Sequence, residues 1–190
     1  MGRLGFVYDQ TRCIGCNACQ MACKDEHDLE PGLFFRRVDT IEFTDENGEH
    51  VMHYSGACNH CEDPVCVKHC PTGAMYIRED GTVGNHTEKC IGCGCCAWAC
   101  PYGVPKVSHR LGKSLKCDSC YDRRREGKEP ACVAACITHC LRFGDLEELT
   151  RDDPDRYTAS LPFLPSPELT HPTLRIKHHL HDGSGDQADQ

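Results

Sequence analysis

Residues 90–101 read Cys-Ile-Gly-Cys-Gly-Cys-Cys-Ala-Trp-Ala-Cys-Pro and contain the spacing C-x2-C-x2-C-x3-C. Residues 13–24, Cys-Ile-Gly-Cys-Asn-Ala-Cys-Gln-Met-Ala-Cys-Lys, repeat this spacing, with each cysteine 77 positions earlier. Because both runs also open with Cys-Ile-Gly-Cys, the chain contains an internal repeat. The rest of the fold has to be built around these two crowded cysteine runs.

Two further cysteine runs lie between and after the repeated pair. The second run is CNHCEDPVCVKHC at residues 58–70, and the fourth is CDSCYDRRREGKEPACVAAC at residues 117–136. Each of the four runs supplies four cysteines, which leaves Cys95 and Cys140 outside the pattern. Only the two-residue spacing selects Cys96 over its neighbour Cys95. We interpret the two extra residues as packed free thiols near a metal site.

The composition indicates that these cysteines hold the chain together. Eighteen of the 190 residues are cysteine, whereas only 34 are Leu, Ile, Val or Phe. So small an aliphatic share is marginal for an ordinary core, and so high a cysteine share is typical of a disulfide- or metal-stapled scaffold. Disulfide scaffolds are usually shorter and exported, and zinc sites usually draw two cysteines from each of two separate knuckles. Neither pattern fits.

The spacing C-x2-C-x2-C-x3-C, followed by proline in the third run, is the bacterial ferredoxin signature. In that signature three thiolates bind one iron–sulfur cubane, while the fourth binds the other cluster of a pair. A tight loop containing Gly15 or Gly92 turns three sulfurs toward one centre, and the fourth cysteine points away. Proline follows the fourth cysteine in the second run as well, whereas Lys24 and Ile137 stand there in the other two.

Crossed ligation, together with the pairing of runs, predicts four ligand sets. The second and third runs both end in Cys-Pro and form one pair; the first and fourth form the other by elimination. We name each set by its leading cysteine. The predicted sets are Cys13, Cys16, Cys19 and Cys136 (cluster 1); Cys117, Cys120, Cys132 and Cys23 (cluster 2); Cys90, Cys93, Cys96 and Cys70 (cluster 3); and Cys58, Cys61, Cys66 and Cys100 (cluster 4).

The motifs around these cysteines resemble a known family over nearly the whole chain. They include CxxCxxCxxxCKD…FRR (Cys13 to Arg37), CNHCEDPxC (Cys58 to Cys66), CPxGAMxxREDG (Cys70 to Gly81), CIGCxxCxxACPYG (Cys90 to Gly103) and KCDxCYDRxxEGKxPxC (Lys116 to Cys132). With these identities the sequence is similar to the four-cluster iron–sulfur electron-transfer subunit of the dimethyl sulfoxide reductase family of molybdenum enzymes.

This resemblance implies a non-catalytic electron relay of anaerobic respiration. The partner would be a large catalytic subunit holding a molybdenum or tungsten bis-pterin (bis-MGD) cofactor, with a membrane anchor handling quinol. The cluster of Cys13 and Cys136 would lie nearest the catalytic subunit, and that of Cys58 and Cys100 nearest the quinol side. Related nitrate reductase subunits carry Trp at the position of Cys93 and a 3Fe cluster there, so four 4Fe–4S clusters are expected here.

Two other functions compete with this interpretation. The chain would equally suit the iron–sulfur beta subunit of a formate dehydrogenase or hydrogenase-type complex, which would bring a different large subunit. A zinc-binding structural adaptor would be colourless and redox-silent. An enzymatic role is not indicated, because the chain has no P-loop, no G-x-G-x-x-G and no nucleophile elbow.

The expected fold class is α+β, with two ferredoxin-like halves, long loops and an extended C-terminal arm. Hairpins are predicted at 37–54 around Asn47-Gly48 and at 75–83 around Glu79-Asp80-Gly81, and short helices after the fourth cysteines. We expect residues 1–149 to form one intertwined four-cluster domain, in which residues 13–23 pair with 117–136 and residues 58–70 with 90–100. Residues 150–190, punctuated by prolines, are expected to reach a partner as an arm, with Gly183–Gln190 disordered. We interpret the histidines at 171, 178, 179 and 181 as a polar tail.

Charge and hydropathy set the remaining expectations. The net charge of −8 argues against nucleic-acid binding. A basic stretch between Lys106 and Lys128 is either a solvated loop or a compensation for the negative charge of clusters. No signal peptide or transmembrane segment is recognisable, so the protein is expected in the cytoplasm, or exported together with a twin-arginine-bearing partner to the outer face of the membrane.

Overall fold

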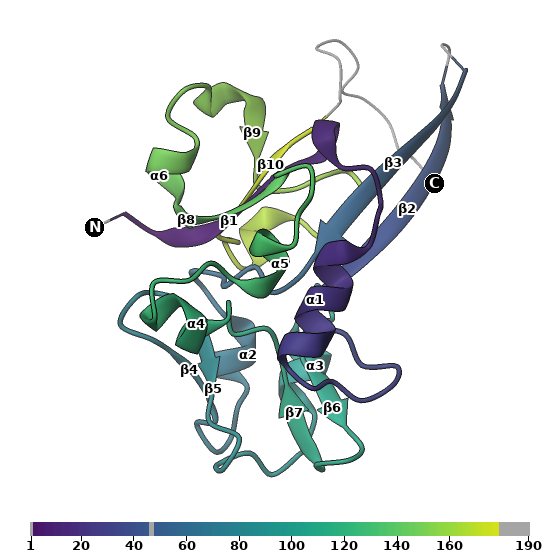
Figure 1. Ribbon diagram of the computed structural model, residues 1–190. Coiled ribbons are helices and arrows are strands. Elements are labelled where there is room, and N and C mark those ends of the chain that lie inside the picture. Colours follow the sequence, from purple (N-terminus) through teal and green to yellow (C-terminus); the bar gives the residue numbers. More distant parts are fainter. Residues whose placement is uncertain (1, 46–47, 179–190) are drawn as a thin grey trace.

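The computed structural model describes residues 2–45 and 48–178. Its main sheet has the strand order β8-β1-β10-β9, with bounds Leu141–Asp145, Leu4–Asp9, Leu174–Lys177 and Tyr157–Thr158. The first strand, β1, is an almost unbroken apolar run, and it pairs antiparallel with β8 and parallel with β10. Val7 and Tyr8 are completely buried, as expected for a strand covered on both faces. The sheet lies at one end of the molecule (Figure 1).

Three two-stranded hairpins complete the β structure of the described residues. The longest joins β2 (Arg37–Asp45) to β3 (Gly48–Gly56) and projects from the body as a ribbon (Figure 1). The others are β4 (Met75–Ile77) with β5 (Val83–Asn85), and β6 (Lys106–Ser108) with β7 (Lys113–Leu115), at the end of the molecule away from the main sheet. Both predicted hairpins are therefore confirmed; Asn47 of the first turn lies outside the described residues.

The helices are short, and four of them carry the third cysteine of a run. These four are α1 (Ala18–Glu26), α2 (Val65–Lys68), α3 (Cys95–Ala99) and α5 (Ala131–Ala134). The prediction that helices follow the fourth cysteines is wrong, because the helical turn lies between the third and fourth cysteines. A cysteine four residues further projects from the same side of the helix about 6 Å along its axis, so its sulfur can reach a neighbouring centre. The remaining helices are α4 (Tyr121–Arg125), α6 (Leu146–Leu149), and the 3-10 turns η1 (Gln10–Arg12), η2 (Pro154–Arg156) and η3 (Pro167–Leu169).

The C-terminal segment packs on its own domain, which differs from the expected free arm. Ile176 of β10 is fully buried beside β1. Just before that strand, the Thr173 hydroxyl donates to the backbone oxygens of Asn59 (2.7 Å) and His60 (2.9 Å) in the second cysteine run. The segment therefore closes over the Cys58 loop as a structural part of the fold. The predicted disordered tail 183–190, with His179 and His181, lies outside the described residues.

Within the part of the chain that the structure describes, the buried side chains form two clusters of unequal size. The larger contains Phe6, Tyr8, Leu141 and Ile176 together with cysteines of the first, second and fourth runs. The smaller consists of Cys66, Met75, Val83 and Cys96. Sulfur thus occupies much of the interior that aliphatic side chains would fill in an ordinary domain of this size.

Candidate metal centres

All four cysteine runs bend in the same way at their first cysteine. The residue two positions later has a positive φ in every run: 66° at Gly15, 44° at His60, 70° at Gly92 and 61° at Ser119. In three runs its backbone N–H donates to the first cysteine's sulfur, at 3.5 Å (Cys58), 3.4 Å (Cys90) and 3.4 Å (Cys117). Left-handed backbone favours glycine, so the sequence indicated this turn only in the first and third runs. His60 and Ser119 adopt it without that advantage.

The Cys13 set surrounds a hollow near the main sheet. Its lining includes Cys13, Cys16 and Cys19 of the first run together with Cys136 of the fourth run. The structure therefore brings together the four residues predicted for cluster 1, although Cys136 is more than a hundred residues away in sequence. Cys16 is exposed, so this set reaches the surface.

Cys140, which the sequence left unassigned, lines the same hollow. Its Sγ lies 3.4 Å from that of Cys136, and its side chain is buried. A hydrogen bond between Cys140 and Cys13 lowers the pKa of the Cys13 thiol to about 5, an effect that its partial burial opposes. Cys140 thus adds a fifth sulfur that can donate a hydrogen bond within the Cys13 set.

The Cys117 set lies deeper in the molecule. Cys23 interacts electrostatically with Cys132 and Cys120, and Cys117 interacts with both Cys23 and Cys132. All four of these cysteines, the predicted cluster 2, are buried. Burial raises the pKa of the Cys23 thiol to about 12, so without a cation this sulfur remains protonated.

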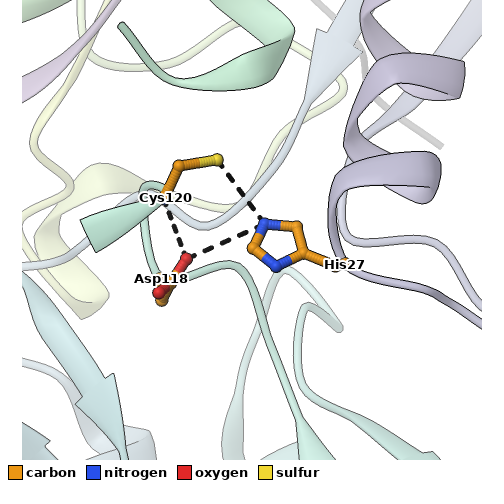
Figure 2. Close-up of side chains that lie close together, drawn as sticks. All are labelled: His27, Asp118 and Cys120. Carbon is orange, nitrogen blue, oxygen red and sulfur yellow. Dashed lines mark hydrogen bonds and ion pairs between the residues drawn. The ribbon is translucent and has the colours of Figure 1, made fainter. Parts of the chain in front are cut away.

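A histidine lies beside this set that the sequence interpretation missed. His27, at the end of α1, has its Nε2 3.5 Å from the Cys120 sulfur and 3.9 Å from Asp118 Oδ1 (Figure 2). Ligand-type atoms of the three residues lie within 4.8 Å of one another. Because Cys120 also belongs to a group of four thiols, the surroundings favour a sulfur-ligated centre in which His27 is a hydrogen-bonding neighbour.

The Cys58 set lines a pocket between the second and third runs. The lining includes Cys58, Cys61, Cys66 and Cys100, the four residues predicted for cluster 4. Thr170, from the segment before β10, and Lys116 also line it. Burial raises the pKa of Cys61 to about 11 and that of Cys66 to about 12.

The Cys90 set lies at the far end of the molecule from the main sheet. Cys96 interacts electrostatically with Cys90 and with Cys70 of the second run. The Cys90 sulfur also accepts a hydrogen bond from the Ser114 N–H at 3.3 Å. Cys93 is exposed and hydrogen-bonds to Cys95, the second unassigned cysteine, which is also exposed.

The contacts between sets define a linear order. Arg36 lies between the Cys13 and Cys117 sets and interacts with cysteines of both. Lys116 connects the Cys117 and Cys58 sets, because it precedes Cys117 and its Nζ lies 3.7 Å from the Cys58 sulfur. Cys66 and Cys96 then share the smaller core cluster. The order is therefore Cys13, Cys117, Cys58, Cys90, and the expectation that the Cys58 set ends the series is wrong.

The donor sets fit iron–sulfur clusters better than isolated ions. Cysteines from two different runs lie together in each set, backbone N–H groups donate to the leading sulfur in three of the four sets, and most of the thiols are buried where only a bound cation would favour the thiolate. Carboxylate or histidine alternatives within the described residues are limited to the neighbourhood of His27.

The basic stretch turns out to have two roles. Most of its arginines pair with acids: Arg124 with Asp80 at 2.9 Å, Arg123 with Glu26 at 3.0 Å and Arg110 with Asp28 at 3.1 Å. Only Lys116 is buried among sulfurs, where its Nζ also donates to the Val83 oxygen at 2.6 Å.

Two family models, both described as 4Fe-4S dicluster domains, match the chain, one over residues 12–74 and the other over residues 49–146. It is 45 % identical to the B polypeptide of the anaerobic dimethyl sulfoxide reductase of Escherichia coli, over 91 % of this chain and 87 % of that protein. Identity is 41 % to the thiosulfate reductase electron transfer subunit of Salmonella typhi, over 75 % of this chain and 76 % of the relative. The chain is 36 % identical to the formate dehydrogenase iron-sulfur subunit of Wolinella succinogenes, over 85 % of this chain and 94 % of that relative.

These matches confirm the predicted α+β fold with two ferredoxin-like halves. They also confirm that the chain is a non-catalytic electron-transfer subunit. No helix among the described residues is long and apolar enough to cross a bilayer.

Proposed function

The chain therefore belongs to the 4Fe-4S dicluster family of iron–sulfur electron-transfer subunits related to that of dimethyl sulfoxide reductase, and from this we propose that it relays electrons through four 4Fe–4S clusters to or from a molybdopterin catalytic subunit. The observation that carries the proposal is the linear order of four four-cysteine sets. When bound, such clusters supply one-electron carriers. The chain's own residues hold them at fixed separations and exclude water from the inner two.

We assign the ligands as the crossed sets predicted from the sequence. The proximity of Cys136 to the first run, and of Cys100 to the second, supports the crossing. Cys23 with the fourth run, and Cys70 with the third, support it in the same way. In each pair the helical turn between the third and fourth cysteines holds neighbouring centres apart.

The two ends of the series are the parts open to partners. At the Cys13 end, Ile14 and Met21 are exposed; at the Cys90 end, Ile91 and Trp98 are exposed. By likeness to the electron-transfer subunit of the dimethyl sulfoxide reductase, we assign the Cys13 end to the catalytic subunit and the Cys90 end to a quinol-side membrane anchor. The complex would then work at the membrane, exported with its partner where that partner carries a twin-arginine signal.

Metal analysis of the purified chain tests the cofactor assignment. We expect about 16 iron and 16 acid-labile sulfide per chain and one-electron signals in electron paramagnetic resonance (EPR) spectra. About four zinc ions without sulfide would overturn the proposal in favour of a structural adaptor.

Co-purification from the native host tests the partner. A large subunit with a bis-pterin molybdenum or tungsten cofactor and S- or N-oxide reductase activity is the expected result. A formate-oxidising or hydrogen-oxidising large subunit would replace the dimethyl sulfoxide reductase assignment while leaving the electron relay in place.

A further inference from the structure

Arg36 is a buried arginine without a carboxylate partner. Its side chain is 2 % exposed, and among residues 2–45 and 48–178 it forms no ion pair with an acid. An unpaired charge inside a protein is strongly unfavourable unless other groups compensate it. The compensation must therefore come from something other than Asp or Glu.

The groups around Arg36 are sulfurs of two different sets. Burial opposes its positive charge, but the neighbouring cysteines raise its pKa, with the effect of Cys132 largest and that of Cys19 next. Cys19 belongs to the Cys13 set and Cys132 to the Cys117 set. The guanidinium therefore lies at the junction of the first two sets in the series.

Hydrogen bonds hold the guanidinium there in one orientation. Nη1 donates to the Ser55 backbone oxygen at 2.9 Å and to its hydroxyl at 3.0 Å, and that hydroxyl lies 3.4 Å from the Cys19 sulfur. The guanidinium carbon also stacks on the Phe6 ring, 4.7 Å from its centroid. The remaining donors, Nε and Nη2, are buried and have no acceptor among the described residues.

We propose that Arg36 is the counter-charge shared by the clusters of the Cys13 and Cys117 sets, and that it favours the reduced state of both. The inference rests on the proposed cluster assignment. A fixed cation between two anionic centres stabilises an added electron on either and weakens the repulsion between them. Arginine suits the position because it stays charged when buried, binds weakly to water and stacks on an aromatic ring.

The test is an EPR-monitored redox titration of the cluster-loaded chain. Iron and sulfide are measured first, and each signal is assigned with a Cys→Ser variant of one set. For Arg36→Gln we expect the ratio of reduced to oxidised cluster at a fixed potential to fall at least tenfold for clusters 1 and 2, which is about 59 mV for a one-electron couple. Cluster 3, in the distant Cys90 set, should not change.

Arg37→Gln is the matched control. It removes the same charge one position along, from an exposed side chain, and should leave all four ratios unchanged. Arg36→Lys keeps the charge and should leave clusters 1 and 2 within about threefold of the wild-type ratio. Unchanged ratios in Arg36→Gln, or an equal shift of all four clusters, would overturn the inference.

Assembly gives a second readout if Arg36→Gln fails to load its clusters. In that case Arg36→Lys should load four clusters and Arg36→Met should not, because the charge is what the site requires. If Arg36→Met loaded four clusters, or if neither Arg36→Lys nor Arg36→Met loaded them, the proposed role of the charge would be overturned. A wild-type chain that lacks iron and sulfide would instead overturn the proposed function.

Discussion

The first and third cysteine runs have the same spacing but different surroundings. The first continues into α1, a nine-residue helix packed against α5, and its Cys19 and Cys23 belong to the larger core. The third continues into α3, five residues long, whose Trp98 is 91 % exposed. The comparison teaches that the repeat determines a local sulfur-binding loop, while neighbouring elements determine whether that loop is buried, polarised or open to a partner.

Removing the iron should abolish the difference between the two copies. Both loops would be held in shape by binding their sulfurs to iron, and metal binding at such sites is coupled to folding, so we expect chelation to eliminate the cooperative thermal transition of the whole chain. Calorimetry and circular dichroism of the apoprotein measure this, with reconstitution by iron and sulfide as the control. A cooperative transition that survives in the apoprotein would contradict the prediction.

Substituting the fourth cysteine of a run should remove a cluster from the partner run. For Cys136→Ser we expect the iron content to fall from about 16 to about 12 atoms per chain, with loss of the cluster 1 signal. Cys23→Ser should instead remove the cluster 2 signal. Cys95→Ser is the control, since that residue is outside every set. If Cys136→Ser removed the cluster 2 signal, the crossed assignment would be incorrect.

Alanine at the repeated glycine should be tolerated better in the first copy than in the third. At Gly92 an added Cβ would overlap the backbone oxygen of Gly112, whereas at Gly15 it would meet only the movable His53 side chain. We expect Gly92→Ala to lower the free energy of unfolding by about 3 kcal/mol and Gly15→Ala by about 1 to 2 kcal/mol.

Denaturant unfolding, followed by the visible absorbance of the clusters, measures both glycine variants. Gly103→Ala is the control for backbone strain alone, because its φ is +58° and no atom lies within 4 Å of the added Cβ. It should cost about 1 kcal/mol. Equal losses at Gly15 and Gly92 would show that backbone strain alone sets the cost.

The two unassigned cysteines, Cys95 and Cys140, should differ in their reactivity toward a thiol reagent. Labelling should not change the stability of the chain. Cys95 is exposed beside Cys93, whereas Cys140 is 3 % exposed within the Cys13 set. We therefore expect maleimide to modify the loaded native chain once, at Cys95, and mass spectrometry after digestion to find Cys140 unmodified. Labelling of Cys140 at a similar rate would show that the Cys13 set opens in solution.

Much of the site was predictable because the spacing of cysteines within each run determines which sulfurs can face one centre. Three cysteines within seven residues have few ways to face one centre, and the crossing rule then pairs distant runs. The hairpins followed from alternation and turn residues. The left-handed backbone at His60 and Ser119 had no such signal, because neither residue is glycine, and only the common loop geometry reveals it.

By itself the sequence determined the chemistry of this protein: sixteen cysteines in four runs, a repeat, and a ferredoxin-like α+β fold. The tertiary structure decided the order of the sets, the place of Arg36 and Lys116 between them, and the return of β10 to the side of β1. The physical reason is the sequence separation over which each interaction acts. Ligand spacing acts over a few residues, whereas burial, parallel strand pairing and the compensation of buried charge depend on segments that meet only after folding.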